Sequence, residues 1–190
     1  METERPLSPQ ESMEVILQAI SRTRDDIRGN SFYFLLWGWL IAIASFAFFG
    51  LLEFVGTRWH FLPFPILGLT GMAITVVHYV RKRAVATESH LTWFLSRLWA
   101  VLGICFLVVV FINVRAGMMP FTYTLLLGGI GTLVSGWTMK FRPLVYGGVI
   151  FLVASVASVF LVEEYKALLH GAAIVAGYLV PGYLLKNAEA

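Results

Sequence analysis

Six long stretches of the sequence contain no Asp, Glu, Lys or Arg. They cover residues 29–52, 59–80, 98–114, 116–139, 143–162 and 167–185. An α-helix needs roughly 20 apolar residues to cross the hydrocarbon core of a bilayer, and these stretches have about that length. Only 13% of the chain is charged, whereas 58% is apolar. This distribution excludes a soluble globular protein, a disordered chain and a nucleic-acid-binding protein as the main interpretation.

The six stretches are continuously apolar rather than alternating, which favours helices over a β-barrel. We therefore expect an all-α, polytopic membrane bundle over residues 31–186, with six transmembrane helices paired as three hairpins. The expected spans are about 32–52, 61–80, 94–114, 120–139, 143–162 and 167–185. Residues 1–30 are expected to be a cytoplasmic segment without a cleaved signal peptide, because they lack a compact apolar core. Residues 187–190 are expected to be a cytoplasmic tail.

The lysines and arginines predict the orientation of the bundle. If the spans alternate in direction, one side of the membrane receives eleven basic residues and the other only three, Arg58, Arg115 and Lys166. Short loops with an excess of Lys and Arg stay in the cytoplasm. The sequence therefore predicts a multi-pass protein of the inner (plasma) membrane with both termini in the cytoplasm.

The segment before the first span has the pattern of an amphipathic helix over residues 9–28. Ser8 and Pro9 resemble the start of a capped helix, and Gly29 is expected to end it. A narrow apolar stripe follows from the spacings of three and four residues between its members, which are Met13, Ile16, Ile20, Thr23 and Ile27. Three uses remain open: packing on the membrane surface or the bundle ends, a short coiled coil that makes a homo-oligomer, and docking of a cytoplasmic protein partner.

Small residues recur within the spans. Gly128, Thr132 and Gly136 form a stripe at four-residue spacing that suits close helix packing. Pro181 lacks the amide that would bond the carbonyl of Gly177, so this pair predicts a kink in the last span and is a candidate hinge. The spans also look like three related hairpins about 45 residues apart, an arrangement known in small transport folds.

No charged residue lies in the middle of any expected span, and the motifs of zinc proteases, serine hydrolases and nucleotide-binding loops are absent. We therefore expect no catalytic site, no cofactor, no metal and no bound nucleic acid. Two histidines at matching depth could ligate a b-type haem, but boundary histidines are the favoured interpretation. A polar set is expected at the outer ends of the spans, where it could hold a metal or a polar head group, with ordinary solvated loops as the alternative. Its members are Glu53, Arg58, Trp59, His60, Arg115, Glu163, Glu164, Lys166 and His170.

Three segments carry a resemblance to a family of uncharacterised bacterial six-span inner-membrane proteins. They are Ser31–Trp39 with the helix before it, Lys140–Leu144 and Tyr178–Lys186. A weaker likeness, in architecture only, is to acid-resistance membrane proteins of the HdeD type. The resemblance implies six spans and carries no established activity.

Two functions are consistent with these features. The first is a non-enzymatic membrane module that acts through helix–helix and partner contacts, with the bilayer as its surroundings. The second is a small transporter or channel subunit for a neutral or weakly polar solute. A close-packed interior would favour the module, whereas a polar cavity reaching the middle of the membrane would favour transport.

Overall fold

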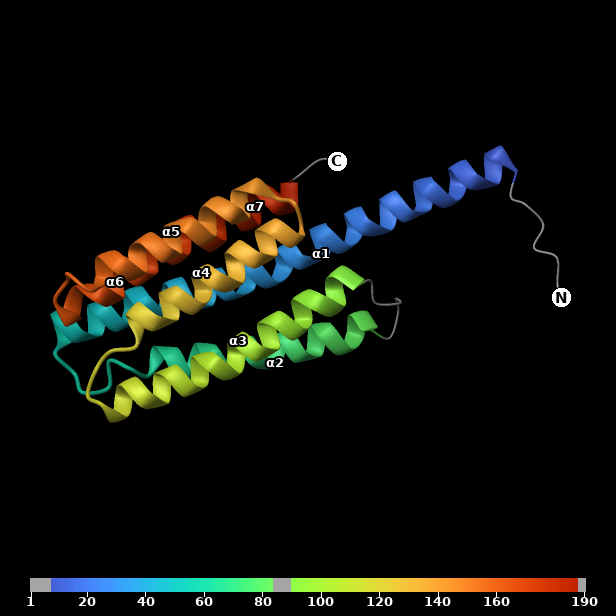
Figure 1. Cartoon of the computed structure of the whole chain (residues 1–190). Helices are drawn as coiled ribbons and strands as arrows, with labels where there is room; N and C mark the ends of the chain where they lie inside the picture. The colour runs from blue at the N-terminus through green and yellow to red at the C-terminus, as the bar shows by residue number, and fades with distance from the viewer. Residues whose placement is uncertain (1–7, 84–89, 188–190) are drawn as a thin grey trace.

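The computed structural model describes residues 8–83 and 90–187, and within these ranges it is helical with no strand (Figure 1). The elements in chain order are α1 (Pro9–Gly50), the π-helical turn η1 (Leu51–Val55), α2 (Pro63–Arg83), α3 (His90–Arg115), α4 (Phe121–Thr138), α5 (Arg142–Ser158), α6 (Glu163–Ile174), the π-helical turn η2 (Val175–Leu179) and α7 (Val180–Asn187). From α1 to α6, each helix runs in the direction opposite to the one before it (Figure 1).

Four helical segments of the described chain are long and apolar enough to cross a membrane. They are Ser31–Val55, Pro63–Arg81, His90–Arg115 and Glu163–Asn187. The last of these combines α6, η2 and α7 into one continuous helical segment at the position of the expected span 167–185, with the π-helical turn where the sequence predicts a kink. α5 is apolar but shorter, with 17 residues, and α4 has 18 residues. Every expected span therefore coincides with a helix, and several of these helices suit a membrane.

The predicted end of the N-terminal helix at Gly29 is wrong. The helix begins at Pro9, as expected, and continues without a break to Gly50. A glycine ends a helix when it adopts a positive φ, and in the described part of the chain only Gly56 and Gly117 among the glycines do so. No proline follows Gly29 to stop the next turn, so the expected amphipathic helix and the first span form one helix of 42 residues.

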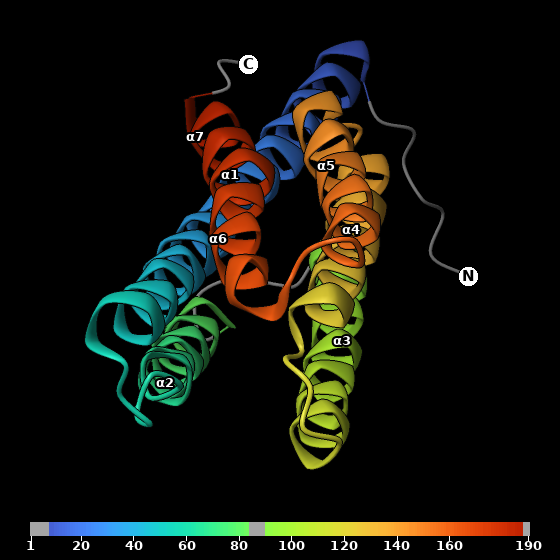
Figure 2. The same ribbon diagram turned by 90° about the vertical axis from the view of Figure 1, so that its left-hand side faces the viewer.

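α1 extends well beyond the other helices at its N-terminal end (Figures 1 and 2). At about 1.5 Å per residue its length is about 63 Å, roughly twice the thickness of a bilayer core. We call the end of the bundle from which α1 protrudes the near end and the opposite end the far end. The far end carries the connections 56–62, 116–120 and 159–162.

The helices form two groups (Figure 2). α4 and α5 are the most closely packed pair, and α3 lies against α4. α1 packs on α2 and on the rod formed by α6, η2 and α7, which also contacts α5. The apolar core lies where these groups meet, around the fully buried side chains of Leu144, Phe151 and Leu185.

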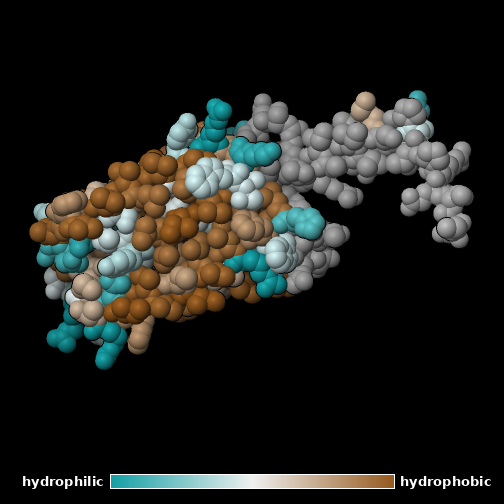
Figure 3. Space-filling model, in the orientation of Figure 1, coloured by the Kyte–Doolittle hydropathy of each residue, from teal (hydrophilic) through white to brown (hydrophobic). Residues whose placement is uncertain are grey.

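The face seen in Figure 3 is mostly apolar along the middle of the bundle, and its hydrophilic residues gather toward the ends of the described helices. Leu69 on α2, Leu107 on α3 and Phe160 after α5 are 73%, 68% and 83% exposed. A continuous apolar surface of this extent is not stable in water and is suited to lipid. The described structure therefore has the outside of a membrane protein.

Candidate functional site

The glycines predicted to form a packing stripe on α4 lie at its contact with α5. A Cβ added to Gly136 would be 2.6 Å from the backbone nitrogen of Val145, and one added to Gly148 would be 2.6 Å from the backbone nitrogen of Leu133. The two helix backbones therefore approach so closely that no side chain fits between them. This confirms the prediction that the stripe is a packing face.

The candidate hinge residues lie in the same packed interior. Gly177 is part of the π-helical turn η2, and Pro181 is in the first turn of α7; both are buried. The amide of Val180 bonds the carbonyl of Val175, five residues earlier, and this wider turn accommodates the proline without a break in the helix. A Cβ added to Gly147 on α5 would overlap the Gly177 carbonyl oxygen. The carbonyl is therefore covered by α5 and is not open to a solute.

His170 is buried among three helices, whereas the sequence places it in a polar set with exposed residues at the outer ends of the spans. Its ring is buried between α6, α1 and α4. Nδ1 is 2.8 Å from Ser45 Oγ, and Nε2 is 3.2 Å from Thr124 Oγ1. Each hydroxyl also lies within hydrogen-bond distance of a carbonyl of its own helix, at Ile41 and Phe121 respectively. One imidazole thus joins three helices with both nitrogens partnered.

The other members of the expected outer set do not gather around His170. Nδ1 of His60 is 2.8 Å from the carbonyl of Thr57 within its own loop, and Lys166 pairs with Glu163 in the first turn of α6. No group of three or more His, Cys, Asp or Glu residues in the described ranges is placed to hold a metal ion. Since both nitrogens of His170 have hydrogen-bond partners, this residue is also not a free axial ligand for haem.

Further side-chain hydrogen bonds join neighbouring helices. Trp37 donates to Thr75 between α1 and α2, and Trp99 donates to Ser135 between α3 and α4. Other hydrogen bonds between helices join Tyr33 with His78, Ser155 and Ser158 with Thr122, and Trp39 with Tyr183. Several polar groups within the spans thus hold neighbouring helices together. Ser45 and Thr124 were not predicted, although a hydroxyl within a charge-free stretch is the signal that could have identified them.

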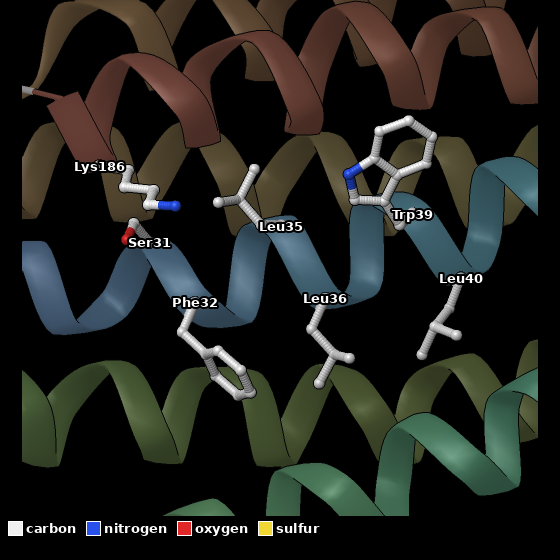
Figure 4. A pocket seen from close by; sticks show the side chains of 7 residues that line it. All are labelled: Ser31, Phe32, Leu35, Leu36, Trp39, Leu40 and Lys186. Carbon is white, nitrogen blue, oxygen red and sulfur yellow. The ribbon is translucent and has the colours of Figure 1, made fainter.

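Two apolar hollows lie on the outside of the bundle at its near end, with volumes of about 360 and 350 Å³. The first follows one face of α1 and ends at Lys186 on α7 (Figure 4). The second lies between Phe32 of α1 and the last turns of α2, and ends at Arg81. Neither of them includes Gly177 or Pro181, and neither is a polar path through the bundle.

The four residues of the predicted interaction stripe lie on the protruding part of α1. Met13 is 60% exposed. The side chains of Ile16, Ile20 and Ile27 are outside the described part of the structure, so the apolar stripe stays a prediction. The chain matches no family model, no curated protein and no solved structure, and the two resemblances drawn from the sequence therefore stay predictions as well.

Proposed function

We propose that the chain is a six-span protein of the inner (plasma) membrane, with both termini in the cytoplasm, and that it acts as a non-enzymatic membrane module through its N-terminal helix. α4 and α5 would be about 27 and 26 Å long, slightly less than the ~30 Å core. The exposed apolar residues that follow α5, Val159 to Val162, extend its apolar length toward that of the other spans.

The basic residues support the orientation. Arg58, Arg115 and Lys166 lie at the far end of the bundle, whereas Arg81, Lys140, Arg142 and Lys186 lie at the near end with the protruding helix. The near end is therefore the richer in Lys and Arg even without the N-terminal segment, and we assign it to the cytoplasm. Reporter fusions at positions 56, 117 and 165 are expected to report the outside, and a cytoplasmic signal from them would reverse this assignment.

The observation that carries the proposed module is the unbroken course of α1. Its second half is fixed in the bundle by buried residues, among them Phe34, Ala42, Ser45 and Phe48. Its first half extends about 33 Å beyond them, if residues 9–30 rise at the usual 1.5 Å each. We expect a helical arm of this length, attached to a membrane-embedded core, to hold the predicted stripe of Met13, Ile16, Ile20 and Ile27 on the cytoplasmic side, with its first residues within reach of a cytoplasmic protein or of the same helix in a second copy.

The packed interior supports a module rather than a transporter. Gly131 and Gly177 pack against side chains rather than lining a path: a Cβ added to Gly131 would be 2.6 Å from Leu102, and one added to Gly177 would be 2.7 Å from Phe151. Enlarging either glycine would therefore disrupt packing whatever the function, so it cannot distinguish the two. Solute flux can: vesicles containing the purified protein are expected to swell in glycerol or urea no faster than empty vesicles.

Photocrosslinking in cells tests the arm directly. A photoreactive amino acid is placed in turn at Met13, Ile16 and Ile20, and at Gln18 and Arg22 as matched controls from the opposite side of the helix. We expect defined protein adducts from the stripe positions only, lost when Ile16→Glu is added to a probe at Ile20. Equal adducts from both sides, or none from the stripe, would contradict the proposal. The mass of the adduct distinguishes a second copy from another protein.

A further inference from the structure

The two hollows at the near end are neighbours, because both are lined by Phe32. Together they form a trough on the outside of the bundle that runs from α7 across α1 to α2. The first hollow is lined by Ser31, Phe32, Leu35, Leu36, Trp39, Leu40 and Lys186. Figure 4 shows Lys186 above one end of the row of apolar side chains that α1 presents.

Specific contacts hold Phe32, which lies between the two hollows, and the side of the trough next to α7 in place. The Phe32 ring stacks on His78 with the ring centres 4.2 Å apart, and His78 Nδ1 is 3.0 Å from the hydroxyl of Tyr33. On the α7 side, Trp39 donates to the hydroxyl of Tyr183 at 3.1 Å. The trough is therefore a formed feature of the surface rather than a gap between loose side chains.

Both charged residues among the described side chains that line the hollows are basic. Lys186 and Arg81 are exposed, lie in the last turns of α7 and α2 at the near end, and each closes one hollow. The side chains that line the two hollows include no Asp or Glu. An apolar trough that ends in two cations at the membrane boundary matches the chemistry of a lipid with acyl chains and an anionic phosphate.

We propose that this trough binds an anionic phospholipid of the leaflet at the near end, with acyl chains beside Phe32, Leu36 and Leu40 and the anionic headgroup at the boundary where Lys186 and Arg81 end the two hollows. The site rests on the proposed membrane arrangement, in which this leaflet is the cytoplasmic one. A second copy of the chain fits less well, because copies in the same orientation bring their own Lys186 and Arg81 to the same depth, where like charges repel.

Lipid binding to the purified full chain in mild detergent tests the proposal. Phosphatidylglycerol and phosphatidylcholine with identical acyl chains are titrated, and the bound lipid is counted by native mass spectrometry. We expect phosphatidylglycerol to bind at least about tenfold more tightly at low salt. Lys186→Gln and Arg81→Gln are each expected to weaken its binding roughly fivefold, since a basic residue near an anionic lipid contributes on the order of that factor. Lys186→Arg should preserve binding.

Two further variants distinguish lipid binding in the trough from nonspecific attraction of the lipid to basic residues at the near end. Arg142→Gln removes an exposed basic residue at the same end but outside the trough, and should leave the affinity unchanged. Leu36→Trp fills the trough without changing a charge, and should weaken both lipids. The proposal is overturned if phosphatidylcholine binds as well as phosphatidylglycerol, if Arg142→Gln costs as much as Lys186→Gln, or if monodisperse Leu36→Trp protein binds normally. Because binding is read in detergent, its failure is distinct from a reversed orientation, which only the reporter fusions detect.

Discussion

The rod formed by α6, η2 and α7 and the peripheral helices α2 and α3 are all apolar enough to cross a membrane, but they differ sharply in how much protein covers them. In the most apolar part of Glu163–Asn187, 56% of the residues are buried, compared with 6% in Pro63–Arg81 and 11% in His90–Arg115. Hydropathy therefore identifies all three as membrane segments without distinguishing the core from the periphery. The difference lies in the residues at the contacts.

Glycine illustrates this difference best. In the core, Gly136, Gly147 and Gly148 face the backbone of a neighbouring helix. In the periphery, Gly68 and Gly103 have no atom within 4 Å of where a Cβ would lie. Lipid tails are as apolar as leucine, so helices associate in a membrane through close packing and hydrogen bonds rather than by exclusion of water. The close backbone contacts should therefore make the core the most stable part of the bundle.

The largest expected effect comes from placing the same side chain at a core glycine and at a peripheral one. Gly148→Val would force α5 away from Leu133 and should lower the free energy of unfolding by about 3 kcal/mol, the upper part of the range for overpacking. Gly103→Val should change it by less than about 0.5 kcal/mol. Unfolding in mixed micelles with increasing dodecyl sulfate, followed by tryptophan fluorescence, measures both. Similar losses at the two sites would remove the distinction between core and periphery.

The next effect concerns the imidazole that joins α6 to α1 and α4. His170→Leu loses its hydrogen bonds to Ser45 and Thr124 and should cost about 1–2 kcal/mol, since such bonds in membrane proteins average about 0.6 and reach about 1.7 kcal/mol. His60→Leu is the control and should cost clearly less in the same assay, because the His60 ring hydrogen-bonds within its own loop and leucine retains apolar contact with Phe48. If the effects of His170→Leu and Ser45→Ala on the free energy of unfolding are additive in a double-mutant cycle, the two residues are not coupled, and the hydrogen bond between them does not stabilise the bundle.

Much of this fold could be predicted from the sequence, because charges mark the ends of apolar segments. Each of the six charge-free stretches falls on a helical rod, and Pro9 begins the first helix. The error at Gly29 has a physical origin: glycine is compatible with both a helix interior and a helix stop, and only its backbone conformation distinguishes them. α5 ends at Ser158, whereas the sequence predicts a span to residue 162. The prediction is too long because the turn that leads to α6 is itself apolar, and composition alone does not reveal it.

The contacts of His170 with Ser45 and Thr124 were harder to predict than the spans. His170 follows Lys166 by one helical turn, which suggests a boundary residue, yet it lies inside the charge-free stretch 167–185. Its burial depends on Ser45 and Thr124, which are 125 and 46 residues away along the chain. The sequence alone does not show which helices are neighbours, so it could not predict that these three residues meet. The trough likewise combines α1, α2 and α7, and no local pattern indicates it.

A smaller effect is expected where single tryptophans attach the peripheral helices. Trp37→Phe loses the bond to Thr75 on α2, and Trp99→Phe loses the bond to Ser135 on α4. Each should cost about 0.6 kcal/mol, because phenylalanine keeps most of the apolar contact. Circular dichroism follows unfolding here, since the substitutions change the fluorescence. Trp137→Phe, at a position 62% exposed, is the control; a loss there equal to the other two would show that ring size, not the hydrogen bond, decides the result.

The smallest expected effect is at the most exposed apolar side chains of the periphery, Leu69 on α2 and Leu107 on α3. In a soluble protein, truncation of a buried leucine costs about 2–5 kcal/mol. Here lipid contacts these side chains in the folded monomer and in separated helices alike, so Leu69→Ala and Leu107→Ala should each change the free energy of unfolding by less than about 0.5 kcal/mol. Detergent micelles at two protein concentrations provide the measurement. A loss above about 1 kcal/mol that grows with protein concentration would mean that a second copy covers α2 or α3, and the sparsely covered periphery would then be an interface of the assembled protein.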